Sequence, residues 1–212
     1  MNMEISEALT ISPGRPDKPT TMEIIGDPSA LTWDRVLPKL QEQATLGRTI
    51  VATNGHFVMF HPGHSAELEL ARAVGAGSRS DHNDDGVVLL VVVNSDAQTK
   101  AKDPVKGAAQ PAVQRAQTVH DNRHVDYVVI SEAPQGDSSV ITDFQKLADS
   151  GLIGPGFVYV KGGDYDMGEN IPPEAQLVQE RGGSFALVDR VGGFSTSSQV
   201  LRMLEVVRQT SS

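Results

Sequence analysis

The 212-residue chain contains no cysteine, which excludes disulfide bonds, thiolate catalysis and cysteine-ligated zinc. It also lacks an apolar run of membrane-spanning length and an apolar leader, so we expect a cytoplasmic protein without a membrane partner. Basic residues are scarce, since 18 Lys and Arg stand against 27 Asp and Glu, giving a formal net charge of −9. No basic stripe is visible, so a nucleic-acid partner is not expected. Phosphate would have to be held locally, by a few cations and backbone amides.

Short strand-like apolar runs alternate with stretches of helical spacing along most of the chain. The nearly unbroken Val/Leu run over 86–93 is typical of a strand buried on both faces of a parallel sheet. The alternation predicts an α/β fold, an open five-stranded parallel sheet with helices on both faces. The other strands are expected over 49–53, 126–130, 157–160 and 184–188, and the helices over 31–47, 62–74, 111–122, 140–150, 172–181 and 197–208.

The N-terminal region differs in composition from the rest. Prolines recur at Pro13, Pro16, Pro19 and Pro28 among scattered polar residues. This composition predicts an irregular N-terminal arm over residues 1–28, followed by one domain over residues 29–212.

Two histidines, His61 and His64, lie three residues apart where a predicted strand turns into a predicted helix. Pro62 suits the first helical position, because its missing N–H would have no partner there. Unpaired backbone N–H groups and the positive end of the helix dipole favour phosphate at such a corner. The imidazoles could donate hydrogen bonds to a nucleotide's phosphates and stabilise charge during transfer. The alternative is that His61 only caps the helix and His64 is a solvated side chain.

Polar and glycine-rich clusters follow the predicted strands. Ligands of open α/β sheets bind at the carboxyl ends of the strands, so this distribution indicates one site rather than scattered loops. The clusters are Asn54–His56, Asn94–Asp96, Ser131–Glu132, Lys161–Tyr165 and Gly192–Ser197.

These residues, taken in order, resemble a known family. The motifs are T-N-G-x-F (53–57), H-P-G-H (61–64), V-N-S-D (93–96), Pro111 with Arg115, V-D-Y-V-V (125–129), K-G-G-D-Y (161–165) and F-S-T-S-S (194–198). The set is similar to the nucleotidyltransferase superfamily with the H-x-G-H motif, whose fold is Rossmann-like. Within it the chain looks most like the heptose-1-phosphate adenylyltransferase, cytidylyltransferase-like half of the bifunctional heptose enzymes. The likeness covers about residues 31–208.

The resemblance implies that a phosphate oxygen of a sugar 1-phosphate attacks the α-phosphorus of a nucleoside triphosphate, and that pyrophosphate leaves. ATP is the expected donor, with CTP or another triphosphate second, and Mg²⁺ is expected on the phosphate oxygens. A different phosphate acceptor, or a nucleotide-binding regulator without catalysis, stays open as an alternative. Relatives commonly pair, so a homodimer is expected.

The resemblance also assigns residues. His61, His64 and Lys161 would be catalytic, touching the reacting phosphates. The nucleotide would be held by Asn54, Gly55, His56, Phe57, Gly63, Gly162, Gly163, Ser195, Thr196 and Ser197, and the acceptor by Arg115, Asn94, Asp96 and Lys106. No metal ligand is expected from the chain. Arg115 could instead be a solvated helix charge, and Ser195 or Thr196 only a helix cap.

The chain departs from the family pattern at two places. His56–Phe57–Val58 stands where Cys-Phe-Asp is usual, so His56 is either a third phosphate donor or a replacement for the cysteine. The usual Arg-Pro before the acceptor-side helix is absent, and Lys106 could substitute for it as a phosphate contact.

Two further groups of polar residues are interpreted without a ligand. The stretch 76–86, with Asp81, His82, Asp84 and Asp85, matches no calcium loop and is expected to be a solvated surface loop. His120 and His124 could share a helix face and bind a metal, but are expected to be surface residues at a helix end because no third ligand is apparent.

Overall fold

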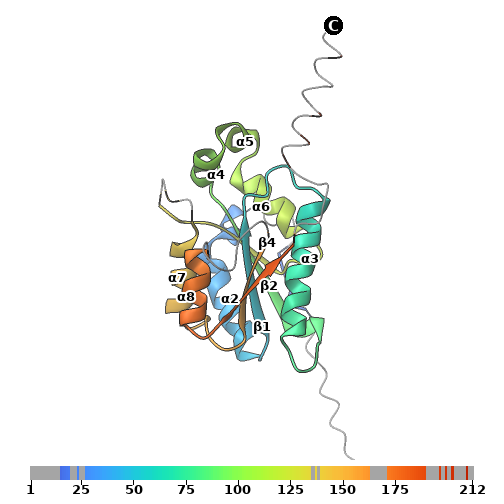
Figure 1. Ribbon diagram of the computed structural model, residues 1–212, viewed down its shortest axis with the longest axis vertical. Coiled ribbons are helices and arrows are strands. Elements are labelled where there is room, and N and C mark those ends of the chain that lie inside the picture. The colour runs from blue at the N-terminus through green and yellow to red at the C-terminus, as the bar shows by residue number, and fades with distance from the viewer. Residues whose placement is uncertain are drawn as a thin grey trace, which may run out of the picture.

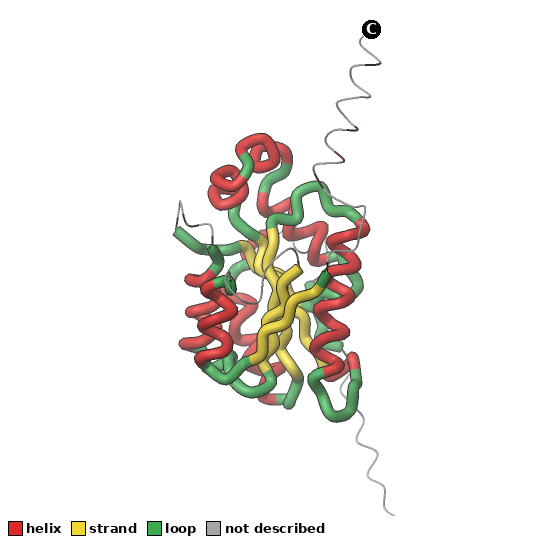
Figure 2. The backbone as a smooth tube through the Cα atoms, viewed as in Figure 1, coloured by secondary structure: helices red, strands yellow, loops and turns green. Residues whose placement is uncertain are grey.

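A computed structural model describes residues 15–19, 23, 27–134, 137, 139–162, 171–189, 196, 199, 202 and 209. Its centre is one five-stranded, all-parallel sheet with strand order β3-β2-β1-β4-β5 (Figures 1 and 2). The strands are β1 (Thr49–Gly55), β2 (Val87–Val93), β3 (Tyr127–Ile130), β4 (Phe157–Gly162) and β5 (Ser184–Val188). The predicted Rossmann-like α/β fold is confirmed.

Helices cover both faces of the sheet, and Figure 1 shows α2, α7 and α8 on one side and α3 and α6 on the other. The helices are α2 (Trp33–Thr45), α3 (Pro62–Gly77), α4 (Asp96–Lys102), α5 (Pro104–Ala109), α6 (Ala112–His120), α7 (Ile141–Asp149) and α8 (Pro173–Glu180), with short 3-10 turns η1 (Pro28–Leu31) and η2 (Asp84–Gly86). No described helix is long and apolar enough to cross a bilayer.

The side chains of β2 alternate between two hydrophobic cores. Val88, Leu90 and Val92 pack with α2, α7 and α8, whereas the residues between them pack with α3 and α6. All seven residues of β2 are buried. This two-sided burial is why the strand reads as a continuous apolar run, as predicted.

The helices α4 and α5 were not predicted. They lie beyond one end of the sheet, between β2 and α6 (Figure 1). The start of α4 is a capping box, because Ser95 Oγ accepts from Gln98 N at 3.2 Å and Gln98 Oε1 accepts from Ser95 N at 2.8 Å. Such short helices carry little apolar periodicity, so the sequence pattern did not indicate them.

The described part of the N-terminal arm contacts the domain at the junction of α6 and β3. Lys18 Nζ donates to the carbonyls of His120, Asn122 and Val125 at 2.7, 3.2 and 2.9 Å. Arg15 pairs with Asp126 at 2.8 Å. The predicted boundary at residue 28 stays a prediction. Within the closing helix predicted over 197–208, the described residues Gln199 and Arg202 are helical, as are Thr196 and Gln209 just outside its predicted ends.

Candidate active site

The corner between β1 and α3 is built around the His61 cap. His61 has extended backbone angles (φ −142°, ψ 168°), and Pro62 occupies the first turn of α3. His64 N donates to the carbonyl of His61 at 2.9 Å and, over a long 3.4 Å, to its ring Nδ1. Since Nδ1 accepts, the proton of the neutral His61 ring lies on Nε2. His61 is therefore a helix cap that still carries a donor.

The two imidazoles lie face to face, with ring centroids 3.7 Å apart and planes inclined by 14°. Phe57 and Phe60 enclose His64, with centroids at 5.3 and 5.4 Å. Burial and the neighbouring His61 lower the pKa of His64 to about 4, and burial also lowers the pKa of His61. Within the described residues, the buried His64 Nδ1 has no hydrogen-bond partner. His64 is thus neutral at pH 7 and is not the solvated side chain of the alternative interpretation.

The loop that carries Phe57 is strained and held in place. Phe57 and Met59 have φ of 50° and 51°, in the left-handed region that non-glycine residues rarely adopt. Met59 N donates to Gln110 Oε1 at 3.3 Å, and Thr196 Oγ1 donates to the Val58 carbonyl at 2.9 Å. Backbone strain of this kind persists only where surrounding contacts determine the conformation.

Lys161 lies at the end of β4, opposite the end of β1. Its Nζ donates to Asn54 Oδ1 at 2.7 Å and to the Asn54 carbonyl at 3.2 Å. Burial lowers the pKa of Lys161 to about 8, although the carboxylates of Glu174 and Glu67 act in the opposite direction. The ammonium therefore loses its proton more readily than an ordinary lysine, yet stays mostly charged at neutral pH.

Glu67 connects β4 to α3. Its Oε1 accepts from Gly162 N at 3.2 Å. A Cβ on Gly162 would lie 2.4 Å from Glu67 Cδ, so a larger residue there would require the Glu67 side chain to move away. Glu67 is one turn after His64 on α3, and Gly162 follows Lys161 on β4. The contact therefore brings the histidine corner and the Lys161 strand end together.

Arg115 is fully buried at the start of α6. Its guanidinium donates to the Gln110 carbonyl at 3.0 Å, the His56 carbonyl at 2.5 Å and Asp96 Oδ1 at 3.0 Å. It is not the solvated helix charge of the alternative interpretation. These contacts connect α6 to Asp96 at the start of α4 and to the His56 carbonyl in the loop after β1.

The side chain of His56 points to α4. Its Nδ1 lies 3.0 Å from Thr99 Oγ1, and that hydroxyl donates to the Ser95 carbonyl at 2.9 Å. Because the hydroxyl proton of Thr99 is used, His56 Nδ1 must be the donor and carry a hydrogen. In the neutral ring Nε2 is then an acceptor, which disfavours direct contact with phosphate.

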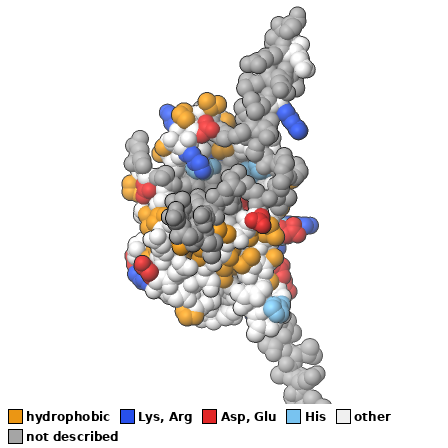
Figure 3. Space-filling view, viewed as in Figure 1, with side chains coloured by type: hydrophobic (Ala, Val, Ile, Leu, Met, Phe, Trp, Pro, Cys, Tyr) orange, Lys and Arg blue, Asp and Glu red, His pale blue; other side chains and the backbone are white. Residues whose placement is uncertain are grey.

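Two other residues predicted to bind the acceptor, Asn94 and Asp96, lie at the same carboxyl edge of the sheet. Asn94 is buried, and its N–H donates to the Gly55 carbonyl at 2.9 Å. Asp96 Oδ1 also accepts from Ala112 N at 2.7 Å, so Asp96 joins α4 to α6. Exposed lysines Lys100 and Lys102 end α4, and Figure 3 shows basic side chains at this end of the molecule.

Several predicted residues cannot be placed. Gly163, Ser195 and Ser197 lie outside the described residues, as does the side chain of Lys106. Two predicted glycines are placed but have no ligand against which to test them: Gly63 lies in the first turn of α3, and Gly55 at the end of β1. The roles assigned to all these residues stay predictions.

Neither of the other polar groups forms a metal site in the described part of the chain. In the 76–86 loop, Asp81 pairs with Arg79 at 2.9 Å, and Asp84 pairs with the buried Arg72 at 2.7 Å. The expectation that His120 is a surface residue was wrong, because it is 2% exposed. The arm that includes Lys18 contacts this helix end, which a local pattern could not reveal.

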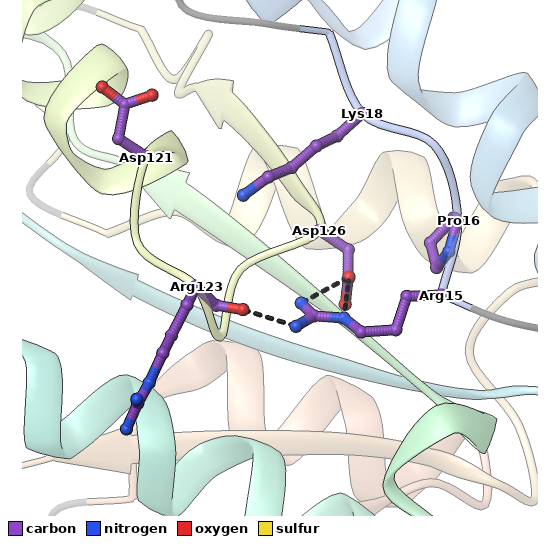
Figure 4. A pocket seen from close by; sticks show the side chains of 6 residues that line it. All are labelled: Arg15, Pro16, Lys18, Asp121, Arg123 and Asp126. Atoms are coloured by element: carbon purple, nitrogen blue, oxygen red, sulfur yellow. Dashed lines mark hydrogen bonds and ion pairs between the residues drawn. The ribbon is translucent and has the colours of Figure 1, made fainter.

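A cavity of about 380 Å³ lies at the amino end of β3, between the N-terminal arm and the segment that joins α6 to β3 (Figure 4). Arg15, Lys18 and Asp126 line it, and their charged groups already contact the protein. Figure 4 shows Arg15 reaching Asp126 and the Arg123 carbonyl while the Arg123 guanidinium points away. Because Asp126 precedes β3 and Lys161 ends β4, the cavity is separate from the candidate site at the carboxyl ends of β1 and β4.

Tyr159, Glu67 and Thr99 were not predicted as part of the site. Tyr159 OH donates to Asn54 Oδ1 at 2.8 Å from a fully buried position in β4. The available signal was spacing, because Tyr159 precedes Lys161 by two residues and side chains two apart share a face of a strand.

Together these elements define an α/β protein with a histidine- and lysine-bearing site at the carboxyl edge of its sheet. No family model matches the chain. It is 37% identical over 177 residues to the bifunctional protein HldE of Nitrobacter winogradskyi, covering 82% of this chain and 30% of that protein. The HldE protein of Bradyrhizobium diazoefficiens is 33% identical over 183 residues, with 85% and 31% covered.

The chain is thus related to part of the HldE proteins. It spans about 30% of the length of the curated relatives that it matches.

Proposed function

We propose that this protein is a nucleotidyltransferase that joins a nucleoside triphosphate, with ATP as the first choice, to a sugar 1-phosphate of the heptose type. The motif resemblance and the relationship to the bifunctional HldE proteins support this proposal. The observation that carries it is the meeting of three elements. Lys161 contacts Asn54 and Gly162 contacts Glu67, so β1, β4 and the N-terminus of α3 form one corner.

The reaction needs positioning and charge stabilisation rather than a covalent enzyme intermediate. An oxygen of the sugar phosphate forms a bond to the α-phosphorus, and the bond between that phosphorus and the oxygen bridging to the β-phosphorus breaks. Pyrophosphate leaves with the electron pair. Negative charge builds on the leaving oxygens, so donors aimed at them lower the barrier.

The α3 N-terminus supplies such donors. The positive end of its dipole favours phosphate, and His61 and His64 add ring N–H donors in a partly dehydrated setting. A neutral imidazole donates without the cost of burying a positive charge. Phosphate that approaches His64 would raise its low pKa and strengthen the contact as charge develops.

Lys161 supplies the fixed cation of the corner. Asn54 holds its ammonium through two oxygens, so little reorganisation is needed when phosphate charge moves toward it. Mg²⁺ enters in this proposal with the nucleotide as part of the substrate, coordinated by phosphate oxygens and water.

The acceptor would lie on the side of the site covered by α4 and α6. In this proposal the buried Arg115 shapes that wall from within, through Asp96 and the His56 carbonyl. The exposed lysines at the end of α4 provide positive potential for an incoming sugar phosphate in an otherwise acidic protein.

The deciding experiment measures pyrophosphate release with Mg²⁺ across four nucleoside triphosphates and a panel of sugar 1-phosphates that includes heptose 1-phosphate. Release with one pair, together with the matching nucleotide sugar by mass spectrometry, is the expected result. K161M serves as the inactive control. Tight nucleotide binding without pyrophosphate release for any pair would contradict the proposed activity and favour a nucleotide-binding regulator. The buried Val58, which replaces the usual aspartate, is the observation that favours this second candidate.

A further inference from the structure

The strand pairing of β1 with β4 places three polar side chains along one face of the sheet. Ala52 pairs with Tyr159, so two residues further along both strands Asn54 comes opposite Lys161. Asn54 Oδ1 accepts from Tyr159 OH at 2.8 Å and from Lys161 Nζ at 2.7 Å. A carboxamide oxygen has two lone pairs, and these two donors occupy them both.

Tyr159 is itself held rigidly. It is fully buried, and its ring packs edge-on against Phe144, with centroids 4.6 Å apart. The ring of Phe185 lies against it in a tilted arrangement, with centroids 5.3 Å apart. The hydroxyl therefore has little freedom to leave Asn54. An ammonium only donates, so the amide must keep its oxygen toward Lys161, and the Tyr159 hydroxyl reinforces that orientation.

We propose that Tyr159 is a positioning residue for nucleotidyl transfer: its buried hydroxyl fixes the Asn54 carboxamide, which in turn holds the Lys161 ammonium at the corner where the phosphates bind. The catalytic part of this inference rests on the proposed function. The positioning part concerns the free protein and can be tested without any substrate.

The first test is NMR titration of the Lys161 side chain in protein labelled with ¹³C at lysine Cε, with the K161R variant identifying the resonance. In Y159F the carboxamide loses its anchor and supports the charged lysine less well. The pKa of Lys161 is therefore expected to fall by about half a unit or more. Tyr127, a buried tyrosine of β3 whose hydroxyl makes no hydrogen bond to described residues, gives the matched control Y127F, which should leave the titration unchanged.

A double-mutant cycle distinguishes positioning from packing. In an N54A background, Y159F should produce no further change in the titration of Lys161, because the connecting amide is gone. N54A alone keeps the packing of Tyr159 and should lower the pKa of Lys161 as Y159F does, so it tests the same link if Y159F folds poorly. An unchanged Lys161 pKa in Y159F, or an equal shift with and without Asn54, would overturn the proposal.

Kinetics add a separate readout. If the proposed transfer occurs, Y159F should lower kcat more than it raises either KM, and the alkaline limb of its pH profile should move down with the Lys161 pKa. If no substrate pair reacts while the NMR shift is present, the proposed function fails and the positioning of Lys161 by Tyr159 stands. If turnover is normal in Y159F across the pH range, the proposed role in transfer is wrong.

Discussion

His64 stacks on His61 with the ring centroids 3.7 Å apart, and its backbone N–H donates back to the His61 carbonyl. His61 thus caps α3 through its carbonyl and its ring Nδ1, and the face of the same ring covers His64. Protonation of both stacked imidazoles is disfavoured, because burial penalises each charge and the two charges would repel each other. The pair is therefore a neutral donor site in the free protein.

We predict that the ring of His64 titrates near pH 4 in the free protein and at higher pH when Mg²⁺-ATP is bound. Burial depresses the free value, and phosphate charge opposes that depression. Titration of the imidazole resonances by NMR, with H64Q for assignment, checks both values. A titration that nucleotide leaves unchanged would show that His64 does not face the phosphates.

The same pKa shift has a consequence for stability. Because the folded state has the lower pKa, the unfolded chain binds more protons between the ordinary value of 6.5 and about 4. His64 therefore leaves stability unaffected above this window and reduces it as the pH falls through it. Thermal unfolding of wild type and H64Q from pH 7 to pH 4 should show a shallower decline in the variant.

Replacement of His64 by alanine should reduce kcat by about a hundredfold, as loss of one transition-state donor does in other enzymes. His82, an exposed residue of the 76–86 loop with φ of 48°, provides the control H82N, because asparagine tolerates that backbone conformation. Turnover and circular dichroism are measured together. Full activity in a folded H64A protein would exclude the assigned role.

Arg115 leads to a prediction on both stability and affinity. R115A removes three hydrogen bonds from a fully buried guanidinium, so the free energy of unfolding should fall by about 2 kcal/mol or more. Since one bond reaches the His56 carbonyl, the KM of the nucleotide should rise along with that of the acceptor. The exposed Arg35 on α2 provides the control R35A. A stable R115A protein with only the acceptor KM raised would identify Arg115 as a direct acceptor ligand.

The sequence predicted the layout of the sheet because burial on both faces leaves a local pattern. The run Val87–Val93 and the turn at Pro62 carry that information in adjacent residues. It could not predict what Lys161 or Tyr159 contacts, because their partner Asn54 is more than 100 residues away in the chain. Tyr159 reads as one more apolar strand position. The sequence left Arg115 as either an acceptor ligand or a solvated helix charge, because its contacts with Asp96 and the His56 carbonyl join distant parts of the chain.

Lys18 ties the N-terminal arm to the end of α6, where helix carbonyls lack partners within the helix. Its ammonium bonds three carbonyls, those of His120, Asn122 and Val125. K18M keeps the length of the side chain but removes all three bonds, so the free energy of unfolding should fall by about 1–2 kcal/mol. Turnover should be unaffected, because this junction is at the amino end of β3 whereas Lys161 is at the carboxyl end of β4.

Chemical denaturation of K18M measures the loss, and K39M, at an exposed position of α2, measures the effect of removing a charge alone. Hydrogen exchange should locate the change, with faster exchange confined to the last turn of α6 and the start of β3. If K18M and K39M unfold at the same denaturant concentration, the three carbonyl contacts of Lys18 do not stabilise the domain. Altered kcat in K18M would instead couple the arm to the site across the full length of β3.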